Sequence, residues 1–343
     1  ELSYDRMHKK GNRTYRVLTQ MEVGGQFWQV ASAPLPIALK SAVPQVEEYC
    51  RTSYYFSPGY LAYNNIKHYD IKVVPVDSSF FRVFDFKLLE GNDEQPFPDV
   101  SSMIISKSKA KVIFGEENPI GKTIKTEDGS AYHVVGIMED IPHNSTIQAD
   151  VLVRFDVLER YESAKLDDNW GTFNYIEYLL LTENSSPEAV ARTIEDMYTQ
   201  MAVRYGVDLK MSARLQPLYD MHLYALSGEA AGMQNVYIFS AIAILILVVA
   251  CINYVNLVTA RASKRGKEIA VKKIMGADKP KLFWQLMVEM VILVLIAVAI
   301  ATLLIYLLMP FYNELSGKEM RFDFFSRSTL LIYAVTVCAA IGL

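Results

Sequence analysis

Nine residues, GEENPIGKT at positions 115–123, are the part of this 343-residue chain that comes nearest to nucleotide chemistry. A phosphate-binding loop has four residues between its first Gly and its Gly-Lys-Thr, because its backbone N–H groups must surround the phosphates. Here Gly115 and Gly121 are separated by five residues, and Pro119 has no N–H to offer. We therefore predict that Lys122 lies in a structural loop and not in a nucleotide site.

The other residue types that could carry chemistry are scattered along the chain. The five His and three Cys residues fit neither the spacing of a zinc site nor that of a redox motif. There is no HExxH, no Gly-x-Ser-x-Gly and no defensible pair of carboxylates. Residues 1–235 also lack the concentrated basic face that nucleic-acid binding needs. We expect no catalytic residue, no bound cofactor, no metal site and no nucleic-acid partner in this chain.

Two long apolar runs dominate the C-terminal third of the sequence. They cover residues 236–258 and 283–309, and each exceeds the ~20 residues that a helix needs to cross a hydrocarbon core. Neither run contains Lys or Arg, and their one carboxylate is Glu289. The whole-chain values, 51% hydrophobic residues and a net charge of −4, therefore blend a soluble domain with a membrane segment. Both runs are predicted to be transmembrane helices.

The stretch between the two runs predicts their orientation. Residues 259–282 contain eight Lys or Arg against two acids. Short loops with this bias stay in the cytoplasm, whereas the linker after residue 309 is balanced in charge. Residues 1–235 are therefore predicted to form an extracytoplasmic domain, and residues 236–343 a membrane segment in contact with lipid.

The two ends of the sequence suggest a fragment. A third apolar run, residues 329–343, has 15 residues and is too short to span, so we expect it to be a truncated membrane helix. Glu1 is not an initiator Met, and no signal peptide precedes it. We therefore expect a first transmembrane helix upstream, which would carry the domain across the membrane.

Strand and helix patterns alternate through residues 1–235, which predicts an α+β extracytoplasmic domain followed by transmembrane α-helices. The domain should have βα-rich flanks around a β-rich insert at about 77–150. A helical pattern covers residues 36–50, although Pro44 argues against a continuous helix. Residues 53–63 and 71–76 are predicted strands.

Turn and cap residues predict several element boundaries more sharply. A helix is expected at residues 107–114, ended by Gly115, and Asp128-Gly129 should turn a hairpin. Ser186 and the Pro after it should begin another helix. Four Phe lie between residues 80 and 86, and we expect them to serve the core.

The basic stretch contains a short amphipathic pattern that allows two interpretations. Gly276 can end a helix there, and Asp278 with Pro280 can begin the next one, which enters the membrane. The helix could be a plain positive-inside anchor that touches lipid head groups. Alternatively, it could be a rigid stub that docks on a cytoplasmic protein.

Residues 253–293 resemble the permease segment of FtsX-like/MacB-type ABC transporters, and residues 1–235 resemble the MacB-like periplasmic core domain. The second resemblance rests on FFRVFDFKLLEG, AKVIFGEENPIGKTI and VVGIMEDIPHNS. The first rests on a basic box that follows the second membrane helix of that family. Eleven consecutive residues match this box: Lys267, Glu268, Ile269, Ala270, Val271, Lys272, Lys273, Ile274, Met275, Gly276 and Ala277.

The resemblance implies a multi-pass permease subunit of the bacterial cell inner membrane, with four transmembrane helices and a large domain in the periplasm. The box at residues 267–277 would couple it to a separate ABC ATPase subunit that holds ATP and Mg, so this chain would not itself be an enzyme. Further implied partners are a second permease copy, in a homo- or heterodimer, a periplasmic adaptor and an outer-membrane channel.

Two outputs remain open for such a permease. It could transmit ATP-driven motion for efflux or extraction of a peptide, lipoprotein or drug, or it could be a scaffold that regulates a periplasmic cell-wall hydrolase. A sensor fits poorly, because the cytoplasmic part is a short loop. Asn253, Asn256 and Glu289 are polar groups within the predicted membrane helices. They would form interhelical hydrogen bonds, or Glu289 would instead reach the membrane interface.

Overall fold

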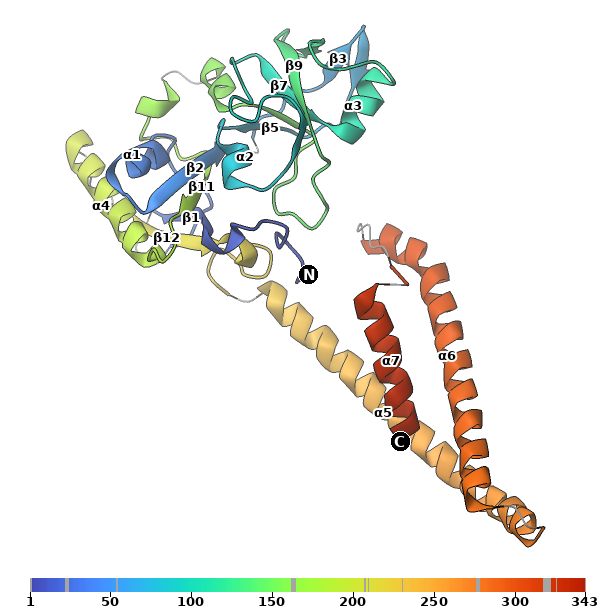
Figure 1. Ribbon diagram of the computed structural model, residues 1–343. Coiled ribbons are helices and arrows are strands. Elements are labelled where there is room, and N and C mark those ends of the chain that lie inside the picture. Colours follow the sequence, from blue (N-terminus) through green and yellow to red (C-terminus); the bar gives the residue numbers. More distant parts are fainter. Residues whose placement is uncertain are drawn as a thin grey trace. The chain divides into compact units, whose positions relative to one another are not determined.

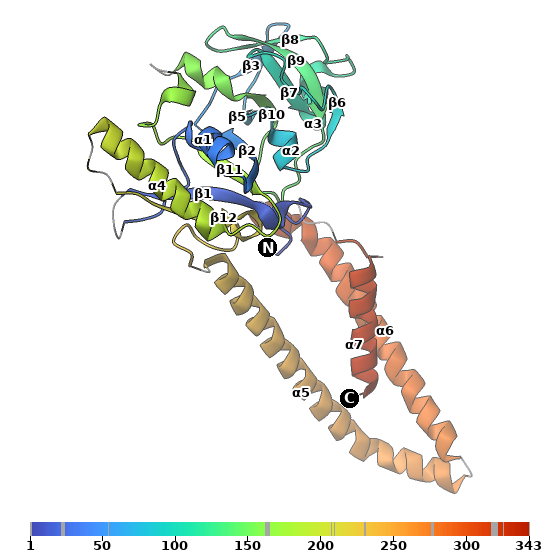
Figure 2. The ribbon, with the colours of Figure 1, turned by 60° about the vertical axis from the view of Figure 1, so that its left-hand side comes forward.

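The computed structural model describes residues 2–342 except 22–24, 54, 162–164, 207, 209, 230, 276–277, 317–321 and 325. The chain divides into two compact units, Glu1–Val236 and Tyr237–Leu343. The first contains a sheet with helices on it, and the second is helical (Figures 1 and 2).

The first unit contains both strands and short helices. Its strands are β1 (Thr14–Gln20), β2 (Val46–Thr52), β3 (Leu61–Tyr63), β4 (Ile66–His68), β5 (Val73–Val76), β6 (Leu88–Glu90), β7 (Ser102–Ser106), β8 (Thr123–Thr126), β9 (Ala131–Met138), β10 (Val151–Arg154), β11 (Ile176–Leu181) and β12 (Ser212–Pro217). Its α-helices are α1 (Leu35–Ala42), α2 (Phe80–Val83), α3 (Lys107–Phe114) and α4 (Pro187–Tyr205). Its 3₁₀ turns are η1 (Gly11–Arg13), η2 (Phe155–Arg160), η3 (Leu166–Asp168) and η4 (Leu218–Asp220).

In the described residues these strands form one mixed sheet. Their order is β12-β1-β11-β2-β5-β10-β7-β9-β8-β3-β4, with β6 paired to β9. The pairs β5–β10 and β7–β9 are parallel, and the other pairs are antiparallel. The predicted α+β fold is therefore confirmed, and the strands of the β-rich segment at 77–150 belong to the same sheet as the flanks.

Successive side chains of β11 point to opposite faces of the sheet, and each face carries its own hydrophobic core. Ile176, Tyr178 and Leu180 pack on one face in the cluster that holds α2 and the buried rings of Phe80 and Phe84. The intervening residues, Leu179 and Leu181, pack on the other face beneath α1 and α4. Figures 1 and 2 both show these two helices beside β11, β2, β1 and β12.

The helix signals read from turn and cap residues are confirmed. α3 occupies residues 107–114, and Gly115 ends it with a φ of 63°, a left-handed value that suits Gly. Asp128-Gly129 joins the antiparallel strands β8 and β9. α4 begins after Ser186, whose side chain accepts a hydrogen bond from the Ala189 N–H.

The interruption expected at Pro44 is confirmed, whereas the strand predicted over 53–63 is wrong in extent. The helical pattern at 36–50 yields a helix only to Ala42, and β2 follows from Val46, because Pro44 cannot continue the helix and Val46, Tyr49 and Cys50 favour a strand. The strand expected over 53–63 is limited in the described residues to β3, whose short pairing with β8 involves Leu61 and Ala62.

In the described residues, the chain from Ala231 onward forms the helices α5 (Ala231–Ile274), which begins in the first unit, α6 (Lys279–Ser316) and α7 (Arg327–Gly342). Among the residues that the structure describes, two segments are long and apolar enough to cross a membrane, Gly232–Leu257 with a mean hydropathy of 2.7 and Leu282–Leu315 with 3.2. These helices are longer than the predicted runs 236–258, 283–309 and 329–343. α6 in particular passes through Pro310, which is tolerated in membrane helices when the freed carbonyl finds another donor.

Candidate functional site

α5 joins the apolar run and the basic box in one unbroken helix. The helix extends well past residue 258, where the predicted membrane run ends, because residues 259–274 contain no Pro and are rich in Ala, Lys and Arg, with Gly266 as the one weak position. The helix continues 17 residues beyond Leu257, the end of its apolar segment. At 1.5 Å per residue this is an arm of about 26 Å.

The end of this arm presents apolar side chains to solvent. Ile274 is 86% exposed, Met275 83% and Val271 55%, and their spacing of three and four residues places them on one face. We call these three residues the tip stripe. Lys272 flanks the stripe, and its Nζ lies 3.4 Å from Gln285 Oε1 on α6.

The structure describes only part of the predicted box. Ala270 and Lys273 are exposed on the last turns of α5, next to the tip stripe. The side chains of Lys267, Glu268 and Ile269 lie outside the described part of the chain, as do Gly276 and Ala277. Their predicted role in coupling therefore stays a prediction.

The polar groups predicted inside the membrane helices come from two different helices. Asn253 and Asn256 are exposed on α5, and Glu289 is half-buried on α6. One hydrogen bond between two apolar segments joins Thr302 on α6 to Tyr333 on α7, with 3.0 Å between the hydroxyl oxygens. The sequence does not indicate this pair, because isolated Thr and Tyr are ordinary in apolar runs.

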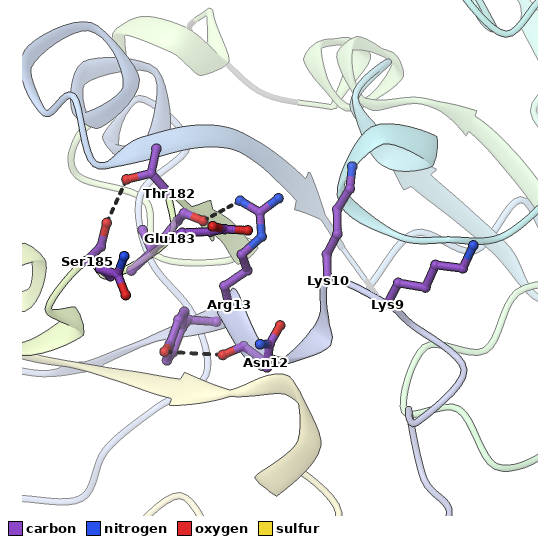
Figure 3. Close-up of a pocket in the computed structure, with 10 residues that line it drawn as sticks. Lys9, Lys10, Asn12, Arg13, Thr182, Glu183 and Ser185 are labelled. Atoms are coloured by element: carbon purple, nitrogen blue, oxygen red, sulfur yellow. Dashed lines mark hydrogen bonds between the residues drawn. The ribbon is translucent and has the colours of Figure 1, made fainter.

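A basic hollow of about 490 Å³ lies beside η1 (Figure 3). Two of its three cations, Lys10 and Arg13, donate to carbonyls of the protein itself. Arg13 Nη1 donates to the Leu181 carbonyl at 2.9 Å, and Lys10 Nζ donates to the Arg82 carbonyl at 2.9 Å. Figure 3 shows Lys9 extending away from Arg13. The charges do not converge on one point, so the hollow does not form an anion site.

A second hollow, of about 530 Å³, has mixed charge and Arg51 at its base. Arg51 is 4% exposed, and its Nε and Nη2 donate to the two oxygens of Asp77 at 2.9 and 2.8 Å. Its Nη1 donates to Asp167 Oδ1 at 2.5 Å. No local pattern in the sequence indicates this cluster, because the partners of Arg51 lie 26 and 116 residues away.

The loop that resembles a phosphate site is a surface connection. It runs from helix α3 to strand β8, the reverse of the strand-to-helix order that phosphate binding uses. Lys122 Nζ bonds Glu117 Oε2 at 2.9 Å, and the Tyr63 hydroxyl donates to the same oxygen at 2.9 Å. In the part of the chain that the structure describes, no three His, Cys, Asp or Glu residues are grouped to hold a metal ion.

Comparison with known families gives two adjoining matches. Residues 2–197 match the MacB-like periplasmic core domain, and residues 240–343 match the FtsX-like permease C-terminal. A crystal structure of a domain from a Porphyromonas gingivalis protein designated a permease is similar, with a TM-score of 0.53 and 26% identity. The aligned region covers 61% of this chain and 91% of that domain.

Two curated relatives are much longer than this chain. The Hahella chejuensis protein MacB, named a macrolide export ATP-binding/permease protein, is 25% identical over 82% of this chain and 41% of its own length. The Bacillus subtilis protein YknZ, named an uncharacterized ABC transporter permease, is 23% identical over 56% of this chain and 45% of its own length. The chain therefore spans less than half the length of these relatives.

Proposed function

Because this chain belongs to the MacB/FtsX-type family of ABC transporter permeases, we propose that it transmits ATP-driven motion from an ABC ATPase to its periplasmic domain. The observation that carries the proposal is α5, a single helix of 44 residues that begins in the first unit and ends at the basic box. A continuous helix can pass a push or a tilt along its axis, whereas a stub joined by a flexible loop would absorb it.

The tip stripe is the proposed contact with the ATPase. An amphipathic helix end that places apolar residues at i, i+3 and i+4 suits an apolar groove on a partner protein. Val271, Ile274 and Met275 have this spacing and are exposed. The flanking cations Lys272 and Lys273 would set the orientation by pairing with acids around the groove. ATP and Mg would be bound by the ATPase as a separate subunit, and this chain would have no catalytic residue.

The proposed location is the bacterial inner membrane, with several passes, the box on the cytoplasmic side and the first unit in the periplasm. The excess of Lys and Arg at residues 259–282 supports this orientation. Labelling of Lys272 in intact cells with a membrane-impermeant amine reagent tests it. Modification from outside would invert the topology and overturn the docking role.

The proposed output is efflux or extraction of a peptide, lipoprotein or drug. A second permease copy would complete the pathway, and a periplasmic adaptor and an outer-membrane channel would continue it. Asn253 and Asn256, which are exposed on α5, would then meet polar groups of that second copy. Co-purification with a cell-wall hydrolase instead of exported cargo would replace this output with a regulatory one.

The coupling role is tested with the full-length protein and its ATPase in nanodiscs. Ile274→Asp and Met275→Asp should each reduce stimulation of ATP hydrolysis by about tenfold or more, because a charge would enter an apolar groove. The matched control is Ile66→Asp, since Ile66 is 62% exposed on β4 in the first unit. Stimulation unchanged in both tip variants, with normal membrane insertion, would refute the contact.

A further inference from the structure

An aromatic pocket of about 330 Å³ lies on the first unit, apart from the tip stripe and the two charged hollows. It is bordered by residues 53 and 55–57 after β2, by the end of η2 and by the residues just before β11. Its aromatic lining comes from all three segments: Tyr55, Phe56, Tyr161 and Tyr175. Its volume is at the lower end of the range for ligand pockets, about 300–1,000 Å³, and suits one planar group.

The floor of the pocket is buried and fixed by packing. Tyr175 is 2% exposed, and its ring meets that of Phe155 edge-on, with 5.4 Å between ring centroids. The guanidinium of Arg51 lies over the Phe155 ring, 4.3 Å from the ring centroid. Leu158, 8% exposed, completes the apolar floor. A floor held in this way is formed before any ligand arrives, which lowers the entropic cost of binding.

One wall is an exposed ring that the protein holds in place. Tyr161 is 59% exposed, yet its hydroxyl donates a 2.7 Å hydrogen bond to Asp128 Oδ2 at the β8–β9 turn. Its ring stands edge-on to Phe56, with 6.1 Å between centroids. Burial and the bond to Asp128 together raise the pKa of Tyr161 to about 12, so the hydroxyl stays a neutral donor.

The chemistry of the lining selects an uncharged ligand. None of the described lining residues carries a charge at neutral pH, and the polar ones are Ser53, Ser57 and Asn174. Aromatic walls favour a second ring, which can stack or meet them edge-on. A carboxylate or phosphate would lose its hydration here without gaining a cation.

We propose that this pocket is a recognition site for an uncharged aromatic group, presented by a peptide or small molecule in the extracytoplasmic space. In this proposal, Phe56 and Tyr161 contact the sides of the bound group, and Tyr175 contacts it at the floor of the pocket. The proposal concerns binding alone and can be measured without an ATPase. It therefore stands or falls separately from the coupling role.

The test uses the full chain in nanodiscs and N-acetyl-L-tryptophanamide as the probe, with binding followed by saturation-transfer NMR. Phe56→Ala and Tyr161→Ala should each weaken saturable binding by about tenfold, since each removes one aromatic wall. Tyr161→Phe keeps the ring but loses the bond to Asp128, so its effect should be smaller. The matched control is Tyr205→Ala, because Tyr205 on α4 is also 59% exposed.

A further variant distinguishes loss of the pocket from misfolding of the protein. Ser57 is an exposed residue on the rim, so Ser57→Trp should fill the pocket without disturbing its floor, and binding of the probe should be lost. Probe binding that survives Phe56→Ala, Tyr161→Ala and Ser57→Trp would overturn the proposal, as would the absence of saturable binding to the wild-type chain. Equal or tighter binding of choline or N-acetylglutamate would also overturn it, because the site would then select charge.

Discussion

Arg51 on β2 lies directly opposite Glu177 on β11 in the antiparallel register, yet the two side chains are not hydrogen bonded to each other. The guanidinium is bound by Asp77, Asp167 and the Ala33 carbonyl. Glu177 is 0% exposed, and neither of its carboxylate oxygens has a hydrogen-bond partner in the described part of the chain. The sheet therefore buries Glu177 beside Arg51, whose guanidinium already donates its hydrogen bonds to other acceptors.

This arrangement predicts that Glu177 makes the first unit less stable at high pH. Burial raises the pKa of Glu177 well above its ordinary value, Arg51 partly opposes the rise, and Asp77 adds to it. The folded state then holds more protons than the unfolded state at any pH between the unfolded pKa, 4.5, and the raised folded pKa. The free energy of unfolding must therefore fall as pH rises through this window.

Replacing Glu177 with Gln should remove this loss of stability at high pH. Glu177→Gln should unfold at nearly the same temperature as the wild type at pH 5 and at a higher temperature at pH 8, by about 2–4 °C for each kcal/mol recovered. Limited proteolysis of the first unit at rising temperature measures the difference. A variant that is less stable than the wild type at both pH values would show that the carboxylate is stabilising.

Asp77 and Asp167 bind the same guanidinium but should contribute very differently to stability. The Asp77 side chain is 13% exposed and bonds Arg51 through both oxygens, whereas that of Asp167 is 59% exposed. Asp77→Ala leaves a buried cation without its main partner and should cost about 3–5 kcal/mol. Asp167→Ala loses an exposed pair and should cost about 1 kcal/mol or less.

Urea unfolding of the first unit, followed by protease susceptibility, compares these two variants. The double replacement Arg51→Met with Asp77→Ala serves as a control, because it removes both charges and should recover part of the loss. Equal effects of the two single variants would contradict the asymmetry in burial.

Local signals in this sequence predicted local structure well. Gly115, the Asp128-Gly129 turn and Ser186 each mark a boundary that the structure contains, because a cap or turn depends on a few adjacent residues. The length of α5 was underestimated, since the change from apolar to basic composition marks a change of solvent and not the end of a helix.

The sites depend on relationships that no short stretch of sequence contains. The contact between Arg51 and Asp167, and the meeting of Phe56 with Tyr161, depend on strand order and register across more than 100 residues. The box at residues 267–277 could be located by its residue-by-residue resemblance to the family's box. Its predicted role depends on a partner surface, which the residues of this chain do not specify.

Lys122 should be dispensable for ATP hydrolysis. Its Nζ pairs with Glu117 in an exposed connection between α3 and β8, far in sequence from the basic box. Lys122→Ala in the full-length protein with its ATPase should leave the rate of hydrolysis and its dependence on ATP concentration unchanged. A rise in KM for ATP would restore the phosphate-loop interpretation, and Lys125→Ala on β8 is the matched control.

The first turn of α5 should tolerate no side chain at Gly232. The Gly232 N–H donates to the Leu223 carbonyl at 3.0 Å, and a Cβ added at Gly232 would lie 2.8 Å from the His222 carbonyl oxygen and 3.0 Å from Leu223 Cα. These are backbone atoms, so Gly232→Val must displace the helix start from residues 218–224, at a cost of about 1–3 kcal/mol.

If motion passes through this contact, Gly232→Val should reduce ATP-driven export while leaving basal ATP hydrolysis intact. Hydrogen–deuterium exchange of residues 218–224 should rise by about tenfold or more, because local opening becomes easier. Gly266→Val is the matched control in the same helix, since a Cβ there meets no atom within 4 Å. Faster exchange at 218–224 with full export would contradict this prediction. ATP-driven motion would then reach the first unit by a route other than the start of α5.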